Sequence, residues 1–555
     1  MTFARLTEGP RAYVLLALLG LALYLPGISA LPATDRDEAR FAQATRQMVE
    51  TGDYLHIRFQ DAPRSKKPAG IHWLQAAAVH ALAGGDTAAI WPYRVPSALG
   101  ALAAVLALFA LARPVLGTRG AFLGALALET CLLLAIEGRL ATTDAVLLAT
   151  VIAAQGALLR VYAGARAGSP PGSAPALLFW AALGLAVLVK GPVAPAISFL
   201  TVAALLVADW RTGLSCGLLR RLRPFTGLLL AAAIATPWFI AVSAGEDGFI
   251  AAAVTGDLLP KLLGGQESHG APPGSYLLLA PLTLWPAALL APLALAWAWH
   301  HRREPAPRML LAWLVPAWLG FEIVPTKLAH YVLPLYPALA LMIGAAVSDD
   351  AIQSWARRWY ARLWLLVWVP AGAGIALILP FAARDLDLPV PGAAWLAGAA
   401  ALLAIVFGTV FLWRGRPASA LAAPGLLMVP FAAAIFALAL PAMSALWPSV
   451  RAEALIARHR APDAPPVAAA GFHEPSLVFA LGTDTVLTDA AGAARHVAAG
   501  GAALALIEAR EEAKFLAALA GLGRRAAALG TVSAVNTARG RPVRLTLYRA
   551  TEDGT

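Results

Sequence analysis

The sequence has few charged residues and almost no cysteine. Of its 555 residues, 14% are charged, whereas about a quarter of the residues of an ordinary soluble protein are charged. The hydrophobic fraction is 59% and the mean hydropathy is +0.69. This composition excludes an ordinary soluble domain and indicates a polytopic membrane protein. Of the two cysteines, Cys131 is predicted in a membrane span and Cys216 in a cytoplasmic loop, so we expect no disulfide and no cysteine metal site.

Long apolar runs predict the fold class, a mainly α bundle of membrane helices. Runs of roughly 17 to 25 apolar residues define about thirteen spans. They fall at about 11–31, 94–113, 118–136, 143–162, 175–190, 192–208, 224–243, 275–299, 308–325, 331–347, 361–382, 391–413 and 419–446. The first run is too long for a cleaved signal and further spans follow, so we expect it to stay as a helix.

The arginines predict the orientation of the spans. Alternate loops carry basic clusters such as 211–223, 300–308 and 356–362, and the loops between them carry few basic residues. Because short cytoplasmic loops are enriched in Lys and Arg, we expect the N-terminus in the cytoplasm and the C-terminus outside. The net charge of +11 then reflects topology and contact with anionic lipid. It is no argument for a nucleic-acid partner.

Two outward segments are too long to be simple connections, and a separate region follows the last predicted span. Residues 32–93 and 244–274 form long loops between predicted spans, and long ordered loops frequently carry function. After residue 446 the hydropathy falls and apolar strand patterns alternate with helical ones. We therefore predict a transmembrane domain over 1–446 and a small α/β domain over 447–555 on the outer face.

The first outer segment opens with the charged stretch "TDRDEARFAQATRQM", residues 34–48. The side chain of Thr34 or Asp35 can cap the N-terminus of a helix there. In return, the side chain of Asp37 or Glu38 can accept the backbone N–H of that capping residue. The helical spacing of the apolar residues that follow predicts an amphipathic helix at the membrane interface. Asp37 and Arg40 share one of its faces. A purely structural interpretation is also open. In it, the helix dipole stabilises the acids in the first turn, and the arginines bind lipid headgroups.

A second basic stretch, "PRSKKPAGIHW", follows at residues 63–73. Lys66 and Lys67 directly precede Pro68, which suits the first turn of another helix. A rigid Lys-Pro corner directs an ammonium group toward the mouth of the membrane domain. Together with Arg40 it predicts an anion site at the lipid–water boundary, although a polybasic contact with headgroups also fits the pattern.

At this point the chain resembles a known family. The stretches "DRDEARFAQATRQM", "RSKKPAGIHW", "EGRLATTDAVL", "LVKGP", "TPWF", "HGAPPGSY" and "TKLAHYVLPLYPALALM" follow one another in the family's order. They are similar to the GT-C glycosyltransferases of the protein-mannosyltransferase and aminoarabinose-transferase type. The resemblance covers most of the membrane region and implies transfer of a sugar, with inversion, from a polyprenyl-phosphate carrier to an acceptor at the outer leaflet. A soluble C-terminal domain is frequent in that family.

The resemblance also implies roles for residues of the first outer loop. Asp37 matches the family's essential acid, Arg40 its partner, and Lys67 the lysine that contacts the donor phosphate. The family's frequent Glu before that lysine, a metal ligand in some members, is Lys66 here. A lysine cannot bind a divalent cation but supplies positive charge itself, so we expect transfer without a metal or other cofactor.

Five further residues are candidates for the same site. Asp144 opens the fourth predicted span, where an N-terminal acid also has a purely structural use. Lys190 is expected at the outer end of a span, within reach of a donor phosphate or of water. Lys327 is a candidate for binding phosphate or acceptor, and Tyr331 for a hydrogen bond to the departing phosphate or for anchoring at the interface. His269 is expected in a loop that covers the site; with Glu267 it makes at most a weak metal candidate.

The predicted chemistry follows from this charge pattern. The cations Arg40, Lys67, Lys190 and Lys327 stabilise a departing polyprenyl phosphate, and Asp37 removes the acceptor proton. The expected acceptor is an envelope glycolipid such as lipid A, or a protein in the alternative of an O-glycosyltransferase. The resemblance favours a monomer in the inner membrane, in contact with lipid, with its site facing the periplasm. Alternatives from other classes are a lipid or sugar transporter or flippase, with charges near the bilayer midplane, and a non-catalytic scaffold.

Overall fold

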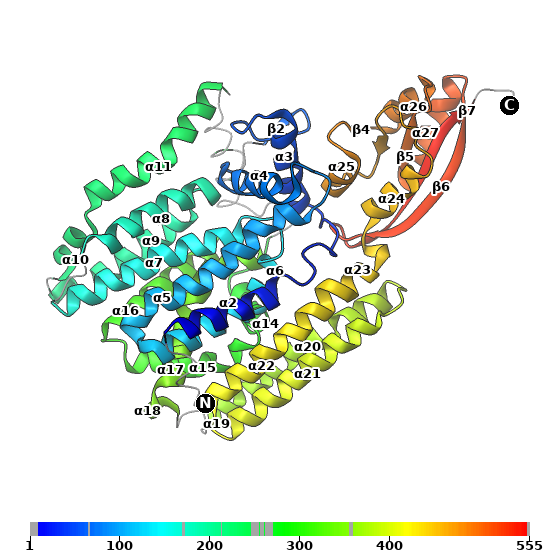
Figure 1. Ribbon diagram of the computed structural model, residues 1–555. Helices are drawn as coiled ribbons and strands as arrows, with labels where there is room; N and C mark the ends of the chain where they lie inside the picture. Colours follow the sequence, from blue (N-terminus) through cyan, green and yellow to red (C-terminus); the bar gives the residue numbers. More distant parts are fainter. Residues whose placement is uncertain are drawn as a thin grey trace.

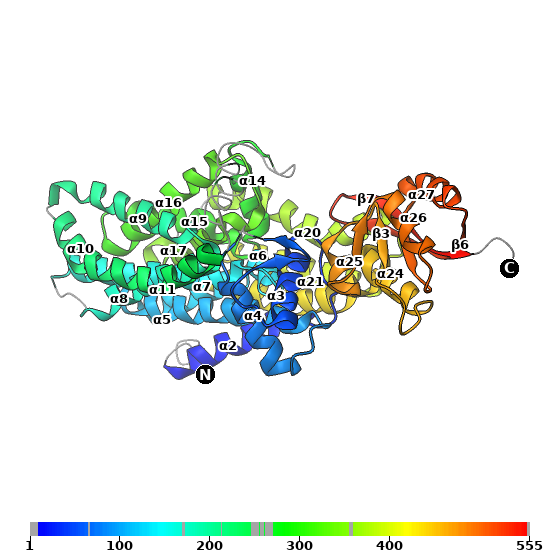
Figure 2. The ribbon, with the colours of Figure 1, turned by 90° about the horizontal axis from the view of Figure 1, so that it is seen from above.

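The computed structural model describes residues 9–64, 67–168, 172–212, 214–245, 255, 260, 270–353 and 359–551. Within these residues the chain forms a long bundle of helices, with a small sheet at one end (Figure 1). Seen from above, the sheet lies beside the bundle and not within it (Figure 2). The predicted class, a mainly α membrane bundle with a small C-terminal α/β region, is confirmed.

Most of the bundle consists of apolar helices. Seven described helices are long and apolar enough to cross a membrane, and one bent pair raises that number to eight. The long elements are α2 (Pro10–Tyr24), α5 (Trp91–Glu129), α7 (Asp144–Arg166), α8 (Ala174–Lys190), α9 (Val193–Ala208), α11 (Pro224–Gly245), α15 (Ala291–His300), α16 (Pro305–Ile323), α17 (Tyr336–Ser348), α20 (Leu365–Asp385), α21 (Gly392–Trp413) and α22 (Pro417–Ala432).

Short helices join the long ones. They are α6 (Leu132–Glu137), η1 (Trp210–Thr212), α10 (Leu214–Leu222), α14 (Ser275–Thr283), η3 (Ala287–Leu290), η4 (Ala329–Leu335), α18 (Asp350–Gln353), α19 (Trp359–Leu363), η6 (Ala433–Ala439), α23 (Leu440–Ala442) and η7 (Ser444–Leu446). A helix overlaps each of the predicted spans. The number of membrane crossings itself stays a prediction, because several of these helices are too short to cross alone.

Three predicted spans differ from straight, separate helices. The second and third merge into α5, which breaks at Gly117, whose φ of 73° lies in the left-handed region that glycine adopts without a steric penalty. The span predicted at 275–299 is bent by 114° between α14 and the η3–α15 unit. Pro281 and Pro286 lie at this bend, and each lacks the N–H group that a continuous helix needs.

Charged residues occupy the two ends of the bundle. Helix α7 has 23 residues, so Asp144 and Arg166 lie roughly 35 Å apart along its axis. Arg166 binds the buried carboxylate of Asp209 at 2.8 Å, and Arg308 binds the same carboxylate. Arg166 and Arg308 belong to the basic loops. Helices α10, α18 and α19 lie at the same end of the bundle, remote from the C-terminal sheet (Figure 1).

The first outer loop contains two helices and a short hairpin. Helix α3 (Asp37–Thr51) packs against α4 (Gly70–Ala83), and strands β1 (Arg58–Phe59) and β2 (Ala62–Pro63) pair between them. The buried Thr45 hydroxyl binds His72 Nδ1 and Gln75 Oε1, each at 2.7 Å. The helices expected in this loop are therefore present, although α4 begins at Gly70 and not at Pro68.

The predicted cap of α3 is wrong. Its N-cap is Arg36, with φ of 65° and no side-chain cap hydrogen bond. Both predicted capping side chains have other partners. Asp35 Oδ1 accepts the backbone N–H of Ser476, and the Thr34 hydroxyl donates to the Glu38 carboxylate at 2.8 Å. One of the two predicted capping interactions is present: the Glu38 carboxylate accepts the backbone N–H of Thr34.

The C-terminal region is a five-stranded mixed sheet with helices. The sheet order is β4-β3-β5-β7-β6, with β3 parallel to β4 and β5, and β7 antiparallel to β5 and β6. Its strands are β3 (Ala468–Ala470), β4 (Val486–Thr488), β5 (Leu504–Glu508), β6 (Arg525–Asn536) and β7 (Arg541–Thr551), and its helices are α24 (Pro448–Ala457), α25 (Pro475–Leu481), α26 (Ala490–Ala498) and α27 (Ala509–Gly521). The alternation of strands and helices predicted after residue 446 is present.

A buried ion pair fixes α3 on the membrane helices. Arg94 of α5 is 0% exposed and Glu38 of α3 is 1% exposed, and Arg94 Nε lies 2.7 Å from Glu38 Oε1. The guanidinium also donates to the carbonyls of Ile28, Leu31 and Pro32. Burial alone would raise the pKa of Glu38, but Arg94 and two backbone N–H groups hold that pKa below its usual value. The pair therefore joins α3, α5 and the segment after α2.

Replacement of Arg94 by Met leaves the Glu38 carboxylate buried without its cation. We expect R94M to lower the stability of the protein by about 3–5 kcal/mol, the usual cost of breaking a buried ion pair. Thermal unfolding in detergent measures the loss. Lys514→Met is the control, because Lys514 is 71% exposed in its pair with Glu511 and exposed pairs contribute about 1 kcal/mol or less. Equal losses in the two variants would contradict an anchoring role for Arg94.

Candidate active site

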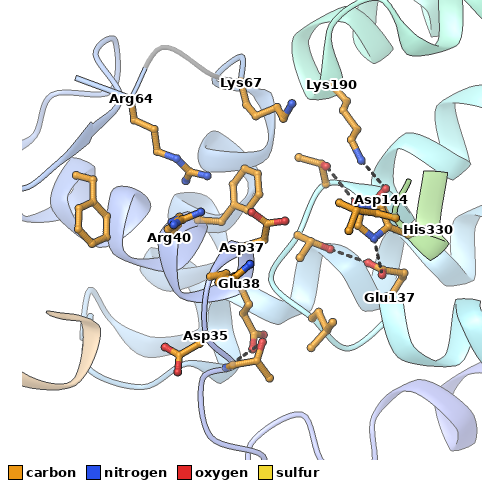
Figure 3. Close-up of a pocket in the computed structure, with 18 of the residues that line it drawn as sticks. Asp35, Asp37, Glu38, Arg40, Arg64, Lys67, Glu137, Asp144, Lys190 and His330 are labelled. Atoms are coloured by element: carbon orange, nitrogen blue, oxygen red, sulfur yellow. Dashed lines mark hydrogen bonds and ion pairs between the residues drawn. The ribbon is translucent and has the colours of Figure 1, made fainter. Parts of the chain in front are cut away.

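A cavity of about 540 Å³ lies where the first outer loop meets the membrane helices. Its walls come from four parts of the chain: the start of α3, the β1–β2 hairpin with Lys67, the α6–α7 turn with the end of α8, and the start of η4 (Figure 3). Acidic and basic side chains from all four parts line it. The cavity therefore joins charges that are far apart in the sequence.

Helix α3 contributes Asp37 and Arg40, three residues apart on one face. Asp37 occupies the first helical position, because the chain turns sharply at Arg36. Among the described residues, neither the Asp37 carboxylate nor the Arg40 guanidinium makes a side-chain hydrogen bond or ion pair. Both groups are thus available to a ligand in the cavity.

The hairpin side of the cavity contributes Arg64 and Lys67. The Arg64 guanidinium lies over the ring of Phe41, 4.5 Å from its centroid, which holds the cation against α3. Figure 3 shows Lys67 and Lys190 extending into the cavity from different walls, and Asp37 lying on α3 below both of them in this view. Four basic side chains, two of them arginines, therefore surround one carboxylate.

The membrane side contributes Asp144 and Lys190. Lys190 Nζ lies 2.6 Å from Asp144 Oδ1, and both side chains are largely buried, at 10% and 7% exposed. The same ammonium lies 5.7 Å from the centroid of the Tyr331 ring. Asp144 is the first residue of α7 and so has the position of a first-turn acid, but its carboxylate binds Lys190 and lines the cavity. The structural and functional interpretations of Asp144 are compatible here.

Glu137 and His330 form a second pair beside Asp144. Glu137 Oε1 lies 3.6 Å from His330 Nδ1, and Glu137 Oε2 accepts a hydrogen bond from Thr142 at 3.0 Å. Burial, together with repulsion from Asp144, raises the pKa of Glu137 to about 8. At neutral pH this carboxyl group is therefore mostly protonated and can donate a hydrogen bond into the cavity.

The structure brings most of the predicted site residues together. Seven of them line the one cavity: Asp37, Glu38, Arg40, Lys67, Asp144, Lys190 and Tyr331. Lys327 does not line it, because its ammonium donates to the backbone carbonyls of Glu322 and Val324, at 3.0 and 2.6 Å. Its neighbours Thr326 and Leu328 do line the cavity. Lys66 and His269 lie outside the described residues.

Several lining residues were not predicted, among them Arg64, Glu137 and His330. Glu137 opens the stretch "EGRLATTDAVL" and lies seven residues before Asp144, so a second acid beside a candidate acid was a visible signal. His330 directly precedes Tyr331. Arg64 gave no separate signal, because only the folded hairpin places its guanidinium over Phe41.

The arrangement suits an anionic ligand. Fixed cations in a partly enclosed site interact with an anion more strongly than the same cations in open water. The described residues include no cluster of three or more His, Cys, Asp or Glu side chains suited to a metal ion. The basic side chains that line the cavity can bind an anion directly.

Comparisons with known proteins agree with this description. Residues 66–240 match the family model of dolichyl-phosphate-mannose-protein mannosyltransferases. The undecaprenyl phosphate-alpha-4-amino-4-deoxy-L-arabinose arabinosyl transferase of Aeromonas hydrophila is 28% identical over 353 residues, which span 63% of this chain and 62% of that protein.

Solved structures share the fold. The crystal structure of ArnT from Cupriavidus metallidurans bound to undecaprenyl phosphate superposes with a TM-score of 0.70 at 20% identity, covering 96% of this chain and 97% of that one. The archaeal oligosaccharyltransferase AglB from Archaeoglobus fulgidus gives a TM-score of 0.50 at 12% identity, over 98% of this chain and 74% of that one. The resemblance that the motifs indicated is therefore confirmed: the chain shares the fold of ArnT, and it is similar in sequence to aminoarabinose transferases and, over residues 66–240, to protein mannosyltransferases.

Proposed function

We propose that the protein is an inverting glycosyltransferase that moves a sugar from an undecaprenyl-phosphate-type carrier to an acceptor outside the cytoplasm. The observation that carries the proposal is the cavity lined by Arg40, Arg64, Lys67 and Lys190 together with Asp37, whose carboxylate makes no hydrogen bond or ion pair with the residues that the structure describes. A phosphate-linked sugar needs cations at the phosphate and an acid or base at the sugar. The arabinosyl transferases similar in sequence, and the ArnT structure with bound undecaprenyl phosphate, support this donor class.

The basic side chains have the role of holding the donor phosphate. When the C1–O bond of the donor breaks, its electron pair goes to the phosphate oxygen, whose negative charge grows. Fixed cations stabilise this charge more in the transition state than in the ground state, which lowers the barrier. Lys190, already oriented by Asp144 at 2.6 Å, needs little reorganisation to join this contact. Lys327 reaches a phosphate only if its ammonium leaves the Glu322 and Val324 carbonyls.

Asp37 has the role of general base. In an inverting reaction the acceptor oxygen attacks C1 from the face opposite the phosphate, and its proton must move to a base. Asp37 lines the cavity and faces no cation at hydrogen-bond distance among the described residues, so its carboxylate is free to accept that proton. With an acceptor phosphate such as that of lipid A, which needs no strong base, Asp37 orients the acceptor instead.

Glu137 has the role of hydrogen-bond donor to the departing phosphate. Its carboxyl group is mostly protonated at neutral pH, lies at the cavity wall, and is oriented by Thr142 and His330. A neutral donor on this side adds to the stabilisation by the cations without adding a negative charge beside the phosphate.

The cellular setting forms part of the proposal. The elements that line the cavity, among them the start of α3 and the β1–β2 hairpin, lie at the end of the bundle opposite the basic loops, which the positive-inside rule assigns to the cytoplasm (Figure 1). An inner-membrane protein with a periplasmic site, acting as a monomer on a glycolipid such as lipid A, fits this arrangement. A protein acceptor is the alternative within the same chemistry. Incubation of the purified protein with labelled undecaprenyl-phosphate sugars, first 4-amino-4-deoxy-L-arabinose, and envelope lipids tests the proposal; no transfer to any fraction would refute it.

Replacement of Asp37 by Asn removes the base but keeps the size of the side chain. We expect D37N to lower kcat by at least about 100-fold, the usual contribution of a general base, while undecaprenyl phosphate still binds. Steady-state transfer and a separate binding measurement distinguish the two effects. Asp61→Asn is the matched control, because Asp61 is exposed in the β1–β2 turn and does not line the cavity. Unchanged kcat in D37N would remove Asp37 from the mechanism.

The pKa of Glu137 predicts the alkaline side of the pH profile. Because this pKa is raised to about 8, the protonated donor is present below pH 8 and lost above it. We expect kcat/KM to fall as the pH rises through about 8. In E137Q the amide donates at every pH, so this alkaline fall should shift or disappear. An identical alkaline fall in the wild-type protein and in E137Q would assign the titration to another group.

The lysine at position 66 predicts that transfer needs no divalent cation. Lys66 supplies positive charge where some relatives of this type have a metal-ligating Glu, and an ammonium group cannot bind a metal ion. We expect full activity after treatment with EDTA, measured as transfer to the envelope acceptor before and after addition of Mg²⁺ or Mn²⁺. A loss of activity in EDTA that Mn²⁺ restores would show that a metal takes part.

A further inference from the structure

The C-terminal sheet region touches the first outer loop at Ser476, whose backbone N–H binds Asp35, and through a short segment that follows it. This docking segment, residues 479–485, runs from the end of α25 through a turn to the start of β4. In Figure 1, α25 lies directly beside α3. The two meet although about 440 positions of sequence separate them. The contact is therefore a tertiary one between the two ends of the chain.

The docking segment binds a face of α3 that is turned away from the cavity. Gln43 Nε2 donates to Thr483 Oγ1 at 2.8 Å, and Thr483 Oγ1 donates to Glu50 Oε2 at 2.8 Å. Arg46 Nη1 donates to the carbonyl of Phe479 at 2.8 Å. At 100° per residue, these three α3 positions lie roughly 120° around the helix from Asp37 and Arg40. One face of α3 thus holds the docking segment while another lines the cavity.

The same segment binds the β1–β2 hairpin. Gln60, in the turn of the hairpin, donates from Nε2 to the carbonyls of Thr485 and Thr483, at 2.5 and 3.1 Å. Gln60 is also joined to α3, because its backbone exchanges two hydrogen bonds with the Gln47 side chain, at 2.9 and 2.7 Å. Phe59 and Arg64 of the hairpin line the cavity. The docking segment therefore holds two cavity walls at once.

An aromatic side chain secures this contact. Phe479 is 5% exposed and its ring lies 5.7 Å from that of Tyr93 in an edge-to-face arrangement. Around it pack Ala42 of α3, Val79 of α4 and Ala141 of the α6–α7 turn. Buried aromatic anchors of this kind contribute much of the energy of an interface. Neither Phe479 nor Thr483 lines the cavity.

We infer that the docking segment positions the active site, by holding α3 and the β1–β2 hairpin in the register that brings Asp37 and Arg40 opposite Arg64 and Lys67. Thr483 and Phe479 are then positioning residues for the reaction. The inference rests on the proposed transfer reaction only for its kinetic consequence. A displacement of about 1 Å at a reacting group can cost about 100-fold in rate, so loss of these contacts should lower kcat more than it weakens donor binding.

Two full-length variants test the inference. T483V removes the hydroxyl that binds Gln43 and Glu50 but keeps the shape of the side chain, and F479A empties the aromatic site. We expect each to lower kcat by about 10- to 100-fold with a smaller change in the KM for the donor. We also expect faster backbone hydrogen exchange over residues 37–51 and 58–64. F479L should recover part of both losses, because it refills the apolar site.

F515A is the matched control for stability. Phe515 is 0% exposed in a different core cluster of the same region, packed 5.2 Å from the Tyr548 ring. We expect F515A to lower the Tm at least as much as F479A, with little change in kcat and in hydrogen exchange over α3. Unchanged kcat and exchange in T483V and F479A, or an equal loss of kcat in F515A, would overturn the inference. If the wild-type protein transfers no sugar, the proposed function fails, while the exchange data still decide whether the segment holds α3.

Discussion

The buried pair of Glu38 and Arg94 is the contact on which the rest of the site depends. Its two charges are almost fully withdrawn from water, and the carboxylate is satisfied by a guanidinium and two backbone N–H groups. Such a group tolerates little movement, because any shift would leave a buried charge without a partner. The position of α3, and with it the direction of Asp37 and Arg40, is therefore fixed one residue away from the Asp37 carboxylate.

The cavity combines fixed and available charges in a way that suits group transfer. Asp144 and Lys190 neutralise each other and form a rigid wall, and Glu137 is kept mostly neutral by its surroundings. Asp37 and Arg40, by contrast, point into the cavity without a protein partner among the described residues. A ligand with both a phosphate and a hydroxyl group would give each of them a partner, the phosphate for Arg40 and the hydroxyl for Asp37. Undecaprenyl phosphate, to which the ArnT of similar fold is bound in its crystal structure, carries such a phosphate.

Much of the fold could be predicted from the sequence, and less of the site. A long apolar run is almost sufficient to predict a membrane helix, and a helix overlaps each predicted span. The bends at Gly117 and Pro286 depend on packing, which the apolar runs do not show. Asp37, Arg40 and Lys67 could be found because the motifs that carry them are short and local. The Lys190 contact with Asp144 joins residues 46 positions apart, and the hydrogen bond of Asp35 to Ser476 joins residues 441 positions apart. No local pattern encodes such pairs, which is also why the predicted cap of α3 was wrong.

The contact between residues 479–485 and α3 also bears on how the molecule matures. Ribosomes deliver α3 first and the docking segment several hundred residues later, and the later segment must reach the same side of the bilayer before it can bind. Contacts of such long sequence separation form slowly, because closing a long loop costs entropy before any interaction is gained. If this segment positions α3 as proposed, an incompletely synthesised or truncated chain would hold its membrane helices without a finished site. Under the proposed function, the order of assembly would then keep the nascent protein from acting on lipid-linked sugars before its C-terminal region is in place.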